Sequence, residues 1–308
     1  MAIQWYPGHM HKARKQIEEI ISKIDLVIEV LDARIPYSSE NPMIQTLRKN
    51  TPCIKILNKA DLADPDITQM WLDHFKAQEH VTAIALTTSN LKQVQSIPDV
   101  CRAMVPEKDQ EHRVLNTMIM GIPNVGKSTL INALAGRVVA KTGNEPAVTK
   151  SQQRINLQNG IVLSDTPGIL WPKVENESSG YRLAVTGAIK DTAMNYEDVA
   201  FFAIEYLCSA YPERLKERYK IESLPDDPMM VFEAIGRARG AIKSGHRINY
   251  HKVSELILHE IRSGKLGQLS LETPSMALQE QEETLIKVEE KRKATEQKLA
   301  MSKKKRRK

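Results

Sequence analysis

Cysteine, aromatic residues and long apolar stretches are all scarce in this chain. Its 308 residues include three cysteines, Cys53, Cys101 and Cys208, which lie far apart and are odd in number. This spacing excludes both a disulfide framework and a cysteine-based zinc cluster. No apolar run reaches the roughly 18 residues of a membrane-spanning helix, and the first residues lack the charged and apolar regions of a signal peptide. We therefore expect a protein of the reducing cytoplasm, without a membrane partner.

Basic residues are unevenly distributed. The chain has 44 Lys and Arg against 38 Asp and Glu, a formal net charge of +6. The last six residues, 303–308, are all Lys or Arg, so the rest of the chain is neutral overall. A terminal basic run favours a polyanion such as RNA. A solvated, disordered end is the alternative, and composition leaves both open.

A phosphate-binding motif lies near the middle of the chain. Residues 121–129 read Gly-Ile-Pro-Asn-Val-Gly-Lys-Ser-Thr and fit the pattern G-x-x-x-x-G-K-[ST]. We expect backbone N–H groups to surround phosphate oxygens, Lys127 to reach the β- and γ-phosphates, and the Ser128 hydroxyl to ligate Mg²⁺. Residues 114–120 read as a strand and 128–135 as a helix whose N-terminus favours an anion. The expected phosphate-binding residues are Asn124, Val125, Gly126, Lys127, Ser128 and Thr129.

A second motif, Asn58-Lys59-Ala60-Asp61, follows a predicted buried strand at 51–57. A carboxylate at Asp61 can accept hydrogen bonds from guanine N1–H and the 2-amino group, and adenine offers no such pair of donors. Asn58 can tie neighbouring loops together, and the stem of Lys59 can lie over the base. Thr87 and Thr88 follow the next strand, at 81–86, where a base-contacting loop is expected. An ordinary polar strand end explains these two threonines equally well.

A third motif, Asp165-Thr166-Pro167-Gly168, ends a predicted hairpin whose turn is Asn159-Gly160. We expect Asp165 to hold Mg²⁺ through water and the Gly168 N–H to sense the γ-phosphate. A threonine in the polar stretch 136–151 can place its hydroxyl on Mg²⁺ when the γ-phosphate is present. The candidates are Thr142 and Thr149, and we favour Thr149.

The residue after Gly168 is Ile169. Ras-like proteins place a water-positioning glutamine there, and an isoleucine can neither orient water nor accept a proton. Lys127 and Mg²⁺ can stabilise the transferring phosphoryl group. Hydrolysis must also draw on another side chain, a bound cation or a partner.

The order of the motifs is unusual, because the guanine motif comes roughly 60 residues before the phosphate-binding motif. In most GTP-binding proteins it comes after. Asn195-Tyr196-Glu197-Asp198 is the one downstream decoy, but it lacks the lysine and a preceding strand. We therefore predict a circularly permuted P-loop GTPase domain of the α/β class, with a mostly parallel sheet and helices on both faces, followed by a small all-α domain.

These motifs, with Trp5-Tyr6-Pro7-Gly8-His9-Met10 and Asp32-Ala33-Arg34, resemble the circularly permuted GTPases of the ribosome-biogenesis GTPase A (YlqF) family. The resemblance covers about residues 1–270. It implies a cytoplasmic enzyme that binds GTP and GDP, hydrolyses GTP and assists late assembly of the large ribosomal subunit. It also implies stimulation by the ribosomal particle and a C-terminal helical domain that binds rRNA.

The family resemblance assigns two further roles. It implies that His9 supports hydrolysis in place of the missing glutamine, and that Asn124 helps to bind a K⁺ ion. Two departures fall on the switch segment, which has Ala147 where relatives usually carry Gly and Arg154 where an aromatic residue is common.

The remaining sequence predicts the domain plan. Residues 1–178 form the GTPase domain, 179–272 a helical RNA-binding domain, and 273–308 a charged linker or helix with the basic tail. We expect helices at 66–78, 91–105, 197–210, 228–242, 249–263 and 279–298, and linkers at 106–111 and 264–274. The helical domain carries candidate phosphate contacts, which a charged solvated face explains nearly as well: Arg237, Arg239, Lys243, Arg247 and Lys252.

Two other functions fit parts of the pattern. A nucleotide-gated RNA-binding adaptor would bind RNA in a GTP-dependent way with incidental hydrolysis. An ATP-dependent RNA remodeller is disfavoured by Asp61 and by the lack of helicase-type motifs. We predict a monomer.

Overall fold

The computed structural model describes residue 15 and residues 17–110, 113–141, 153–168, 170–171 and 174–305. Its centre is a six-stranded sheet with the strand order β3-β2-β1-β4-β6-β5. Neighbouring strands run parallel, except for the antiparallel pair β5–β6. The strands are β1 (Leu26–Asp32), β2 (Cys53–Asn58), β3 (Val81–Leu86), β4 (Leu115–Gly121), β5 (Gln153–Asn156) and β6 (Ile161–Asp165). The α/β prediction is confirmed.

The central strands are buried because helices cover both faces of the sheet. Every residue of β1 and β2 is buried. A parallel strand in this position needs apolar side chains on both faces, and the Val, Ile and Leu runs of β1 and β2 supply them. Glu29 and Lys55 are the polar residues inside these strands, and Asp32 and Asn58 are polar residues at their ends. Glu29 and Lys55 are neighbours across β1 and β2 and form an ion pair at 3.9 Å.

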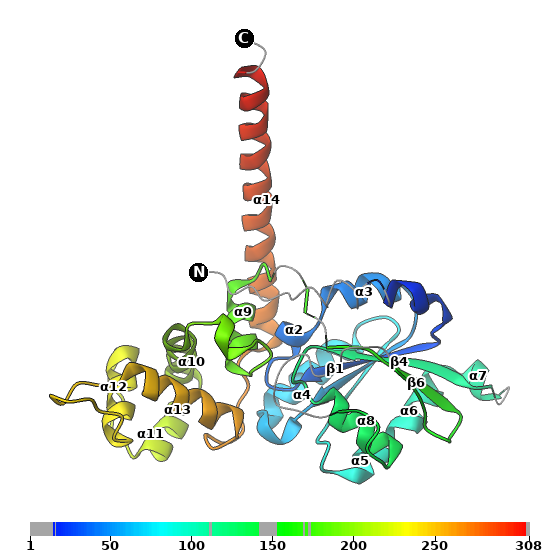
Figure 1. Ribbon diagram of the computed structural model, residues 1–308, viewed down its shortest axis with the longest axis horizontal. Helices are drawn as coiled ribbons and strands as arrows, with labels where there is room; N and C mark the ends of the chain where they lie inside the picture. The colour runs from blue at the N-terminus through cyan, green and yellow to red at the C-terminus, as the bar shows by residue number, and fades with distance from the viewer. Residues whose placement is uncertain are drawn as a thin grey trace.

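Helices lie on both sides of the sheet, as Figure 1 shows. One side carries α3 (Pro42–Arg48), and the other carries α5 (Leu91–Gln95), α6 (Ile97–Met104) and α8 (Lys127–Ala135). The short α2 (Pro36–Ser39) follows β1, and α4 (Pro65–Lys76) packs beside β3. Trp71 and Phe75 of α4 are buried in the core, whereas Met70 is 49% exposed.

Two predictions for residues 91–111 need correction. The expected single helix is divided at Ser96 into α5 and α6, because Pro98 near the start of α6 has no N–H to continue a helical ladder. The expected linker at 106–111 is wrong, since Pro106–Gln110 forms α7.

The C-terminal half is helical, as predicted. It contains α9 (Glu177–Val185), α10 (Tyr196–Ala210), α11 (Pro212–Tyr219), α12 (Pro228–Ala238) and α13 (Tyr250–Arg262). Asn176, Asn195 and Asn249 begin three of these helices, and their side chains accept backbone N–H groups of the first turn. Residue 178, at which we placed a domain boundary, is the second residue of α9. Short 3₁₀ turns complete the fold at Ile21–Lys23, Ala60–Leu62 and Asp191–Ala193.

Residues 264–273, which we name the strap, are not the free linker that their Gly and Ser content predicted. Leu266, Leu269 and Leu271 are buried. The Leu269 N–H donates to the Leu62 carbonyl at 3.0 Å, and the Leu271 N–H donates to the Arg34 carbonyl at 2.8 Å. The chain therefore returns from the helical bundle to the sheet domain before α14 begins.

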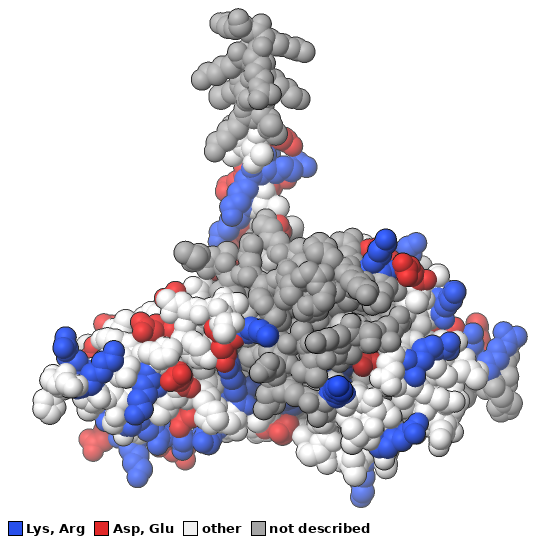
Figure 2. All heavy atoms as spheres, in the orientation of Figure 1, with Lys and Arg blue, Asp and Glu red and all other residues white. Residues whose placement is uncertain are grey.

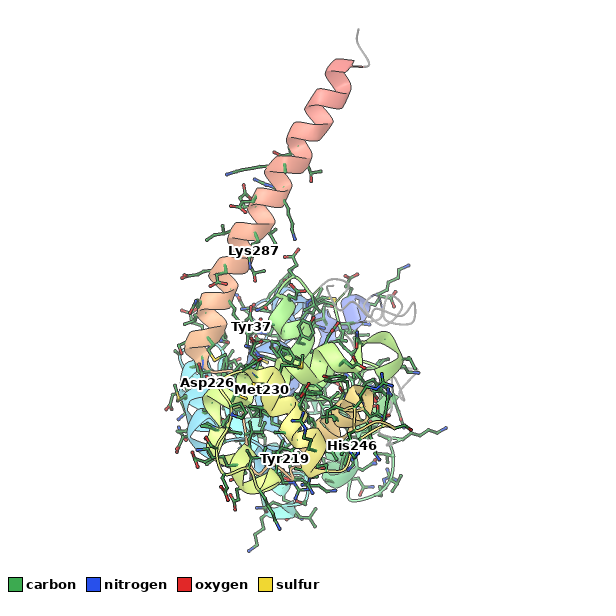
Figure 3. All side chains as sticks on the ribbon, turned by 90° about the vertical axis from the view of Figure 1, so that its left-hand side faces the viewer. Tyr37, Tyr219, Asp226, Met230, His246 and Lys287 are labelled. Atoms are coloured by element: carbon green, nitrogen blue, oxygen red, sulfur yellow. The ribbon has the colours of Figure 1, made fainter. Side chains whose placement is uncertain are left out.

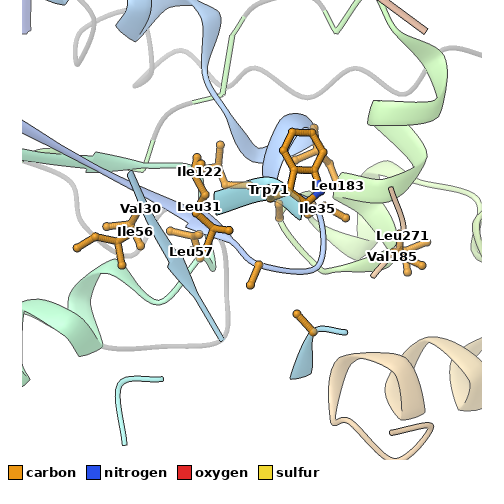
Figure 4. Packing of buried hydrophobic residues seen from close by; sticks show 14 of the residues in the cluster. Val30, Leu31, Ile35, Ile56, Leu57, Trp71, Ile122, Leu183, Val185 and Leu271 are labelled. Atoms are coloured by element: carbon orange, nitrogen blue, oxygen red, sulfur yellow. The ribbon is translucent and has the colours of Figure 1, made fainter. Parts of the chain in front are cut away.

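The strap joins the two halves into one core. Leu271 and Val185 of α9, both labelled in Figure 4, belong to one buried cluster that also includes residues of β1 and β2. Glu272 is fully buried, accepts the Ser38 N–H at 2.8 Å and pairs with Arg182 at 3.3 Å. These contacts bind α2, α9 and the strap together.

The last helix, α14 (Pro274–Lys305), is longer than the predicted 279–298. Its first turns pack on the body, where Glu280 pairs with Arg182 at 2.6 Å. It then leaves the globule, as Figures 1 and 3 show, and Leu285 and Ile286 are exposed. No helix described for residues 15–305 combines the length and the apolar character that crossing a membrane requires.

Candidate nucleotide-binding site

The predicted motifs meet at one edge of the sheet. Because β1, β2, β4 and β6 are parallel and adjacent, their carboxyl ends lie side by side. Those ends carry Asp32, Asn58, Gly121 and Asp165. Ligands of open α/β sheets bind at this kind of edge.

The phosphate-binding loop requires its glycines. Gly126 has φ +92°, and a β-carbon there would lie 2.3 Å from the Asn58 amide nitrogen. A β-carbon on Gly121 would lie 2.7 Å from the Val30 carbonyl oxygen. Helix α8 begins directly after this loop, so its N-terminus faces the place where phosphate is expected. Ser128 is half-buried and Thr129 exposed in the first turn.

The guanine motif is bonded to the phosphate-binding loop. The Asn58 side-chain amide donates to the Val125 carbonyl at 2.8 Å, and the Lys59 ammonium donates to the Asn124 carbonyl at 2.7 Å. Lys59 adopts a left-handed conformation with φ +61°, which turns the chain toward the loop. Two segments about 65 residues apart in sequence therefore form one structural unit.

Asp61 and Thr87 lie together at the opposite end of this unit. The Thr87 hydroxyl donates to the Asp61 carboxylate at 3.0 Å and accepts the Asp61 N–H at 3.2 Å. Asp61 is exposed, whereas Ala60, Thr87 and Thr88 are half-buried. The loop after β3 thus supports the guanine motif through Thr87, and the predicted contact of this loop with a base stays a prediction.

Lys127 and Asp165 form a buried ion pair between α8 and β6. Burial lowers the pKa of Lys127 and raises that of Asp165, and each charge opposes part of the shift in the other. The two side chains predicted to meet phosphate and Mg²⁺ are thereby in contact with each other.

The Asp165-Thr166-Pro167-Gly168 turn lies against the phosphate-binding loop. The Thr166 hydroxyl donates to the Ile119 carbonyl at 3.0 Å. A β-carbon on Gly168 would lie 3.1 Å from backbone atoms of Pro123. Gly168 therefore permits the close approach of the two loops.

Sequence reasoning missed the ionic network behind the site. Arg34 donates twice to Asp32, at 2.9 and 2.8 Å, and Lys59 donates to the same carboxylate at 2.9 Å. Burial alone would raise the pKa of Asp32, but the charges of Arg34 and Lys59 hold it well below its usual range. Asp32-Ala33-Arg34 was the available signal, since it is one of the segments that carry the family resemblance, but it did not give the partners of these side chains.

Another missed contact links the site to the helical half. The Asn124 side-chain amide donates to the Gly187 carbonyl at 2.8 Å. Arg262 of α13 packs against Gly187 and donates to the Val185 carbonyl at 2.9 Å. No local pattern in the sequence pairs Asn124 with Gly187.

Several predicted residues lie outside the described part of the chain. They are His9, Thr142, Thr149 and Ile169. Their predicted roles in hydrolysis and Mg²⁺ binding stay predictions.

Comparisons with known proteins also indicate a GTPase. A model of the 50S ribosome-binding GTPase family matches residues 116–233, from the second residue of β4 into α12. Ribosome biogenesis GTPase A of Priestia megaterium is 48% identical over 287 residues, which cover 91% of this chain and 99% of that protein. Ribosome biogenesis GTPase A of Bacillus cereus is 47% identical over 297 residues, 94% of this chain and 100% of that protein.

Solved structures agree. The structure of GNP-bound YlqF from T. maritima is 28% identical, has a TM-score of 0.58 and covers 85% of this chain and 98% of its own. GDP-bound TM YlqF gives a TM-score of 0.59 at 28% identity, over 84% of this chain and 99% of its own.

The family match begins at β4, although the Asn58–Asp61 motif bonded to the phosphate-binding loop comes earlier in the sequence. This is the arrangement expected of a circular permutation. With relatives identical at nearly half of their positions, this chain belongs to the ribosome biogenesis GTPase A family of circularly permuted P-loop proteins and is a GTPase.

Proposed function

We propose that this chain binds GTP and GDP at the carboxyl edge of the sheet, with the base near Asp61 and the phosphates at residues 122–129. The observation that carries the proposal is the bond from Asn58 to the Val125 carbonyl at 2.8 Å, with Lys59 on the Asn124 carbonyl beside it. These bonds hold the base-recognising and phosphate-binding loops in one fixed relation. A nucleotide holds its base and its phosphates at a limited separation, so the two loops that bind them must also be held at a matching separation.

Guanine selectivity rests on Asp61. Its carboxylate accepts hydrogen bonds only, so it matches the N1–H and 2-amino donors of guanine. The Thr87 hydroxyl holds one carboxylate oxygen at 3.0 Å, which fixes the direction of the other. Adenine presents no matching pair of donors on that edge.

The residues at the phosphate end fit Mg²⁺. The Ser128 hydroxyl and the Asp165 carboxylate are hard oxygen ligands, and Mg²⁺ takes few protein ligands when phosphate and water complete its shell. Thr149 is proposed as a further ligand in the GTP state. Mg²⁺ would neutralise charge on the phosphates, and Lys127 would exchange its contact with Asp165 for phosphate oxygens.

Hydrolysis needs a group that Ile169 cannot supply. We assign to His9 the role of supporting the attacking water. We assign to Asn124 a contribution to K⁺ binding through its amide oxygen, because its amide nitrogen donates to Gly187. Lys127 stabilises the charge of the transferring phosphoryl group.

We also propose that the chain is a monomeric cytoplasmic assembly factor for the large ribosomal subunit. Its GTP state would bind rRNA in the precursor, and the particle would stimulate hydrolysis. The names of the relatives support this proposal. Lys243, Arg247 and Lys252 are exposed and suit phosphate contacts, together with the basic residues at 303–308.

Two of the residues predicted to contact RNA are less suited to binding phosphate, because their side chains already pair with carboxylates. Arg239 pairs with Glu260 at 3.4 Å and lies over the Tyr219 ring, and Arg237 pairs with Glu233 at 2.9 Å. In Figure 2, basic side chains gather at the far left edge, where Figure 1 has the loop between α12 and α13. That loop carries Lys243 and Arg247, which makes it the preferred RNA contact.

The test is GTP hydrolysis with and without purified large ribosomal subunits, in K⁺ and in Na⁺, for wild type and His9→Ala. His80→Asn is the control, because His80 is exposed, has φ +58° and Asn tolerates that conformation. We expect a subunit-dependent rise that is lost in His9→Ala and kept in His80→Asn. An unchanged rise in His9→Ala would remove His9 from the mechanism. No rise for wild type, despite GTP binding, would favour the RNA-binding adaptor.

A further inference from the structure

A cavity of about 420 Å³ lies in the helical half, away from the nucleotide-binding edge. Helices α9, α10, α12 and α13 each contribute to its lining. Its volume falls within the roughly 300–1,000 Å³ that ligand sites occupy. Neither the nucleotide site nor the exposed basic residues of the α12–α13 loop take part in it.

The walls of the cavity are aromatic. Tyr181 and Phe202 stack with ring centres 4.9 Å apart, and Phe232 stacks on Tyr250 at 6.1 Å. At the rim, the side chain of Met229 is 42% exposed. Its neighbour Met230, which Figure 3 labels on the end of the molecule turned toward the viewer, is 57% exposed. Flexible, apolar methionines at a rim suit contact with a polypeptide.

The charge of the cavity is of one sign. Glu197, Asp198 and Glu205 lie along one side of α10 and line it, and no Lys or Arg in the described part of the chain does. None of the three carboxylates forms an ion pair with a Lys or Arg among the described residues. Burial and the charge of Asp198 both raise the pKa of the Tyr181 hydroxyl, as expected for a phenol in a negative field.

We propose that this cavity binds an Arg or Lys side chain of a basic protein segment. Aromatic faces attract a cation through their ring quadrupoles, and the carboxylates at the mouth form charge-assisted hydrogen bonds with it. An RNA phosphate would meet three carboxylates and be repelled. The helical half would then bind two kinds of partner, RNA at its basic loop and a basic protein at α10.

The test is binding of a fluorescent ten-residue peptide of alternating Arg and Gly to the full-length chain, measured by anisotropy. The matched probe replaces each Arg by citrulline, which keeps the shape and removes the charge. The test variant combines Glu197→Gln, Asp198→Asn and Glu205→Gln. The control variant, Glu282→Gln with Glu283→Gln and Glu290→Gln on α14, changes net charge equally at exposed positions.

We expect the test variant to weaken peptide binding at least tenfold, while the control variant changes it less than twofold. Tyr250→Leu, at an exposed position, should weaken binding roughly threefold, because a cation on an exposed ring contributes about 0.5–1 kcal/mol. The citrulline peptide should not bind. Basal GTP hydrolysis should be unchanged in all variants.

Three results would overturn the proposal. One is equal binding of the Arg peptide to wild type and to the test variant. Another is that an RNA oligonucleotide displaces the bound peptide from wild type, whose cavity is intact, but not from the test variant. The cavity would then be an RNA site. The third is self-association of wild type that the test variant loses, which would make a second copy of this chain the occupant.

Discussion

The side chain of Asn124 and the backbone of Gly187 are joined by a hydrogen bond of 2.8 Å, which links the phosphate-binding loop to the turn after α9. Arg262 supports the same turn from α13, because its guanidinium donates to the Ala184 and Val185 carbonyls at 2.8 and 2.9 Å. The loop expected to bind phosphate is therefore in contact with the helical half through one short chain of bonds. A substitution at Asn124 should therefore alter the effect that a substitution at Arg262 has on stability, and the reverse.

Coupling between Asn124 and Arg262 can be measured without nucleotide. Asn124→Ala should lower the free energy of unfolding by about 1 kcal/mol and Arg262→Met by about 2 kcal/mol, because hydrogen bonds to a charged group contribute more than neutral ones. In a double-mutant cycle by urea unfolding, the coupling energy should reach about 0.5 kcal/mol or more. Arg237→Met is the control, since Arg237 is exposed and its ion pair among the residues that the structure describes is with Glu233 of its own helix. Additive effects of Asn124→Ala and Arg262→Met would contradict the link.

Asp61→Asn should reverse the base preference of the site. Loss of a charged acceptor should weaken GTP binding roughly tenfold to a hundredfold, since such hydrogen bonds contribute about 1.5–3 kcal/mol. Xanthine carries a carbonyl where guanine carries the 2-amino group, so the new amide donor should strengthen binding of xanthosine triphosphate. Asp61 is exposed, and the amide oxygen of Asn can keep the bond from Thr87, so folding should not change. Titration calorimetry with both nucleotides measures the outcome, and an unchanged ratio of affinities would place the base elsewhere.

Gly126→Ala should separate the guanine motif from the phosphate-binding loop. Its β-carbon would lie 2.3 Å from the Asn58 amide nitrogen, and the residue has φ +92°. Gly136 is a matched control, because it has φ +62° and no atom of the described residues lies within 4 Å of an added β-carbon. Gly136→Ala should cost about 1 kcal/mol of stability from conformational strain alone, and Gly126→Ala about 1–3 kcal/mol more.

GTP affinity distinguishes the two glycine variants further. It should fall sharply in Gly126→Ala and stay near that of wild type in Gly136→Ala. Equal stability and equal GTP affinity in the two variants would contradict this prediction. They would show that the Asn58 side chain can move away from the added β-carbon without loss of stability or of GTP binding.

The sequence determined the sheet and its motifs well because these depend on local patterns. The sequence patterns predicted β2, β3 and β4, and the spacing from Gly121 to Ser128 predicted the loop between β4 and α8. The parallel sheet then brought the motifs to one edge, as the permuted order required. The helix of α13 followed from apolar residues such as Val253 and Ile257 on one face.

What could not be predicted depends on partners far away in the chain. The strap has the Gly and Ser content of a loop, and it is buried because the Leu271 N–H donates to the Arg34 carbonyl and the Glu272 carboxylate accepts the Ser38 N–H. Glycine content reports on backbone freedom and carries no information about what covers a segment. Asn124 likewise gives no local signal for Gly187. Glu197 and Asp198 of α10 were interpreted only as part of the motif at 195–198, because the aromatic residues that complete the cavity include some from three other helices.

Glu29 should make the stability of the protein depend on pH. Burial raises its pKa from 4.5 to about 7, and the nearby charge of Lys55 opposes part of that shift. Between these two values the folded chain keeps a proton that the unfolded chain has lost, so the free energy of unfolding falls as pH rises. A shift of this size corresponds to about 3 kcal/mol, fully expressed above pH 7. Glu29→Gln should remove this slope, since its amide oxygen can still accept the Asn41 N–H and Lys55 keeps its contact with Glu40.

The comparison is urea unfolding of wild type and Glu29→Gln at pH 5 and pH 8. Relative to wild type, Glu29→Gln should be more stable at pH 8 than at pH 5, by up to about 3 kcal/mol, because only wild type must bury an ionised carboxylate at the higher pH. Glu282→Gln, at an exposed position, controls for the change in net charge and should leave the pH dependence of wild type in place. An equal stability difference at both pH values would mean that Glu29 is ionised throughout, held by Lys55 against the effect of burial. The ion pair across β1 and β2 would then outweigh desolvation at the centre of the sheet.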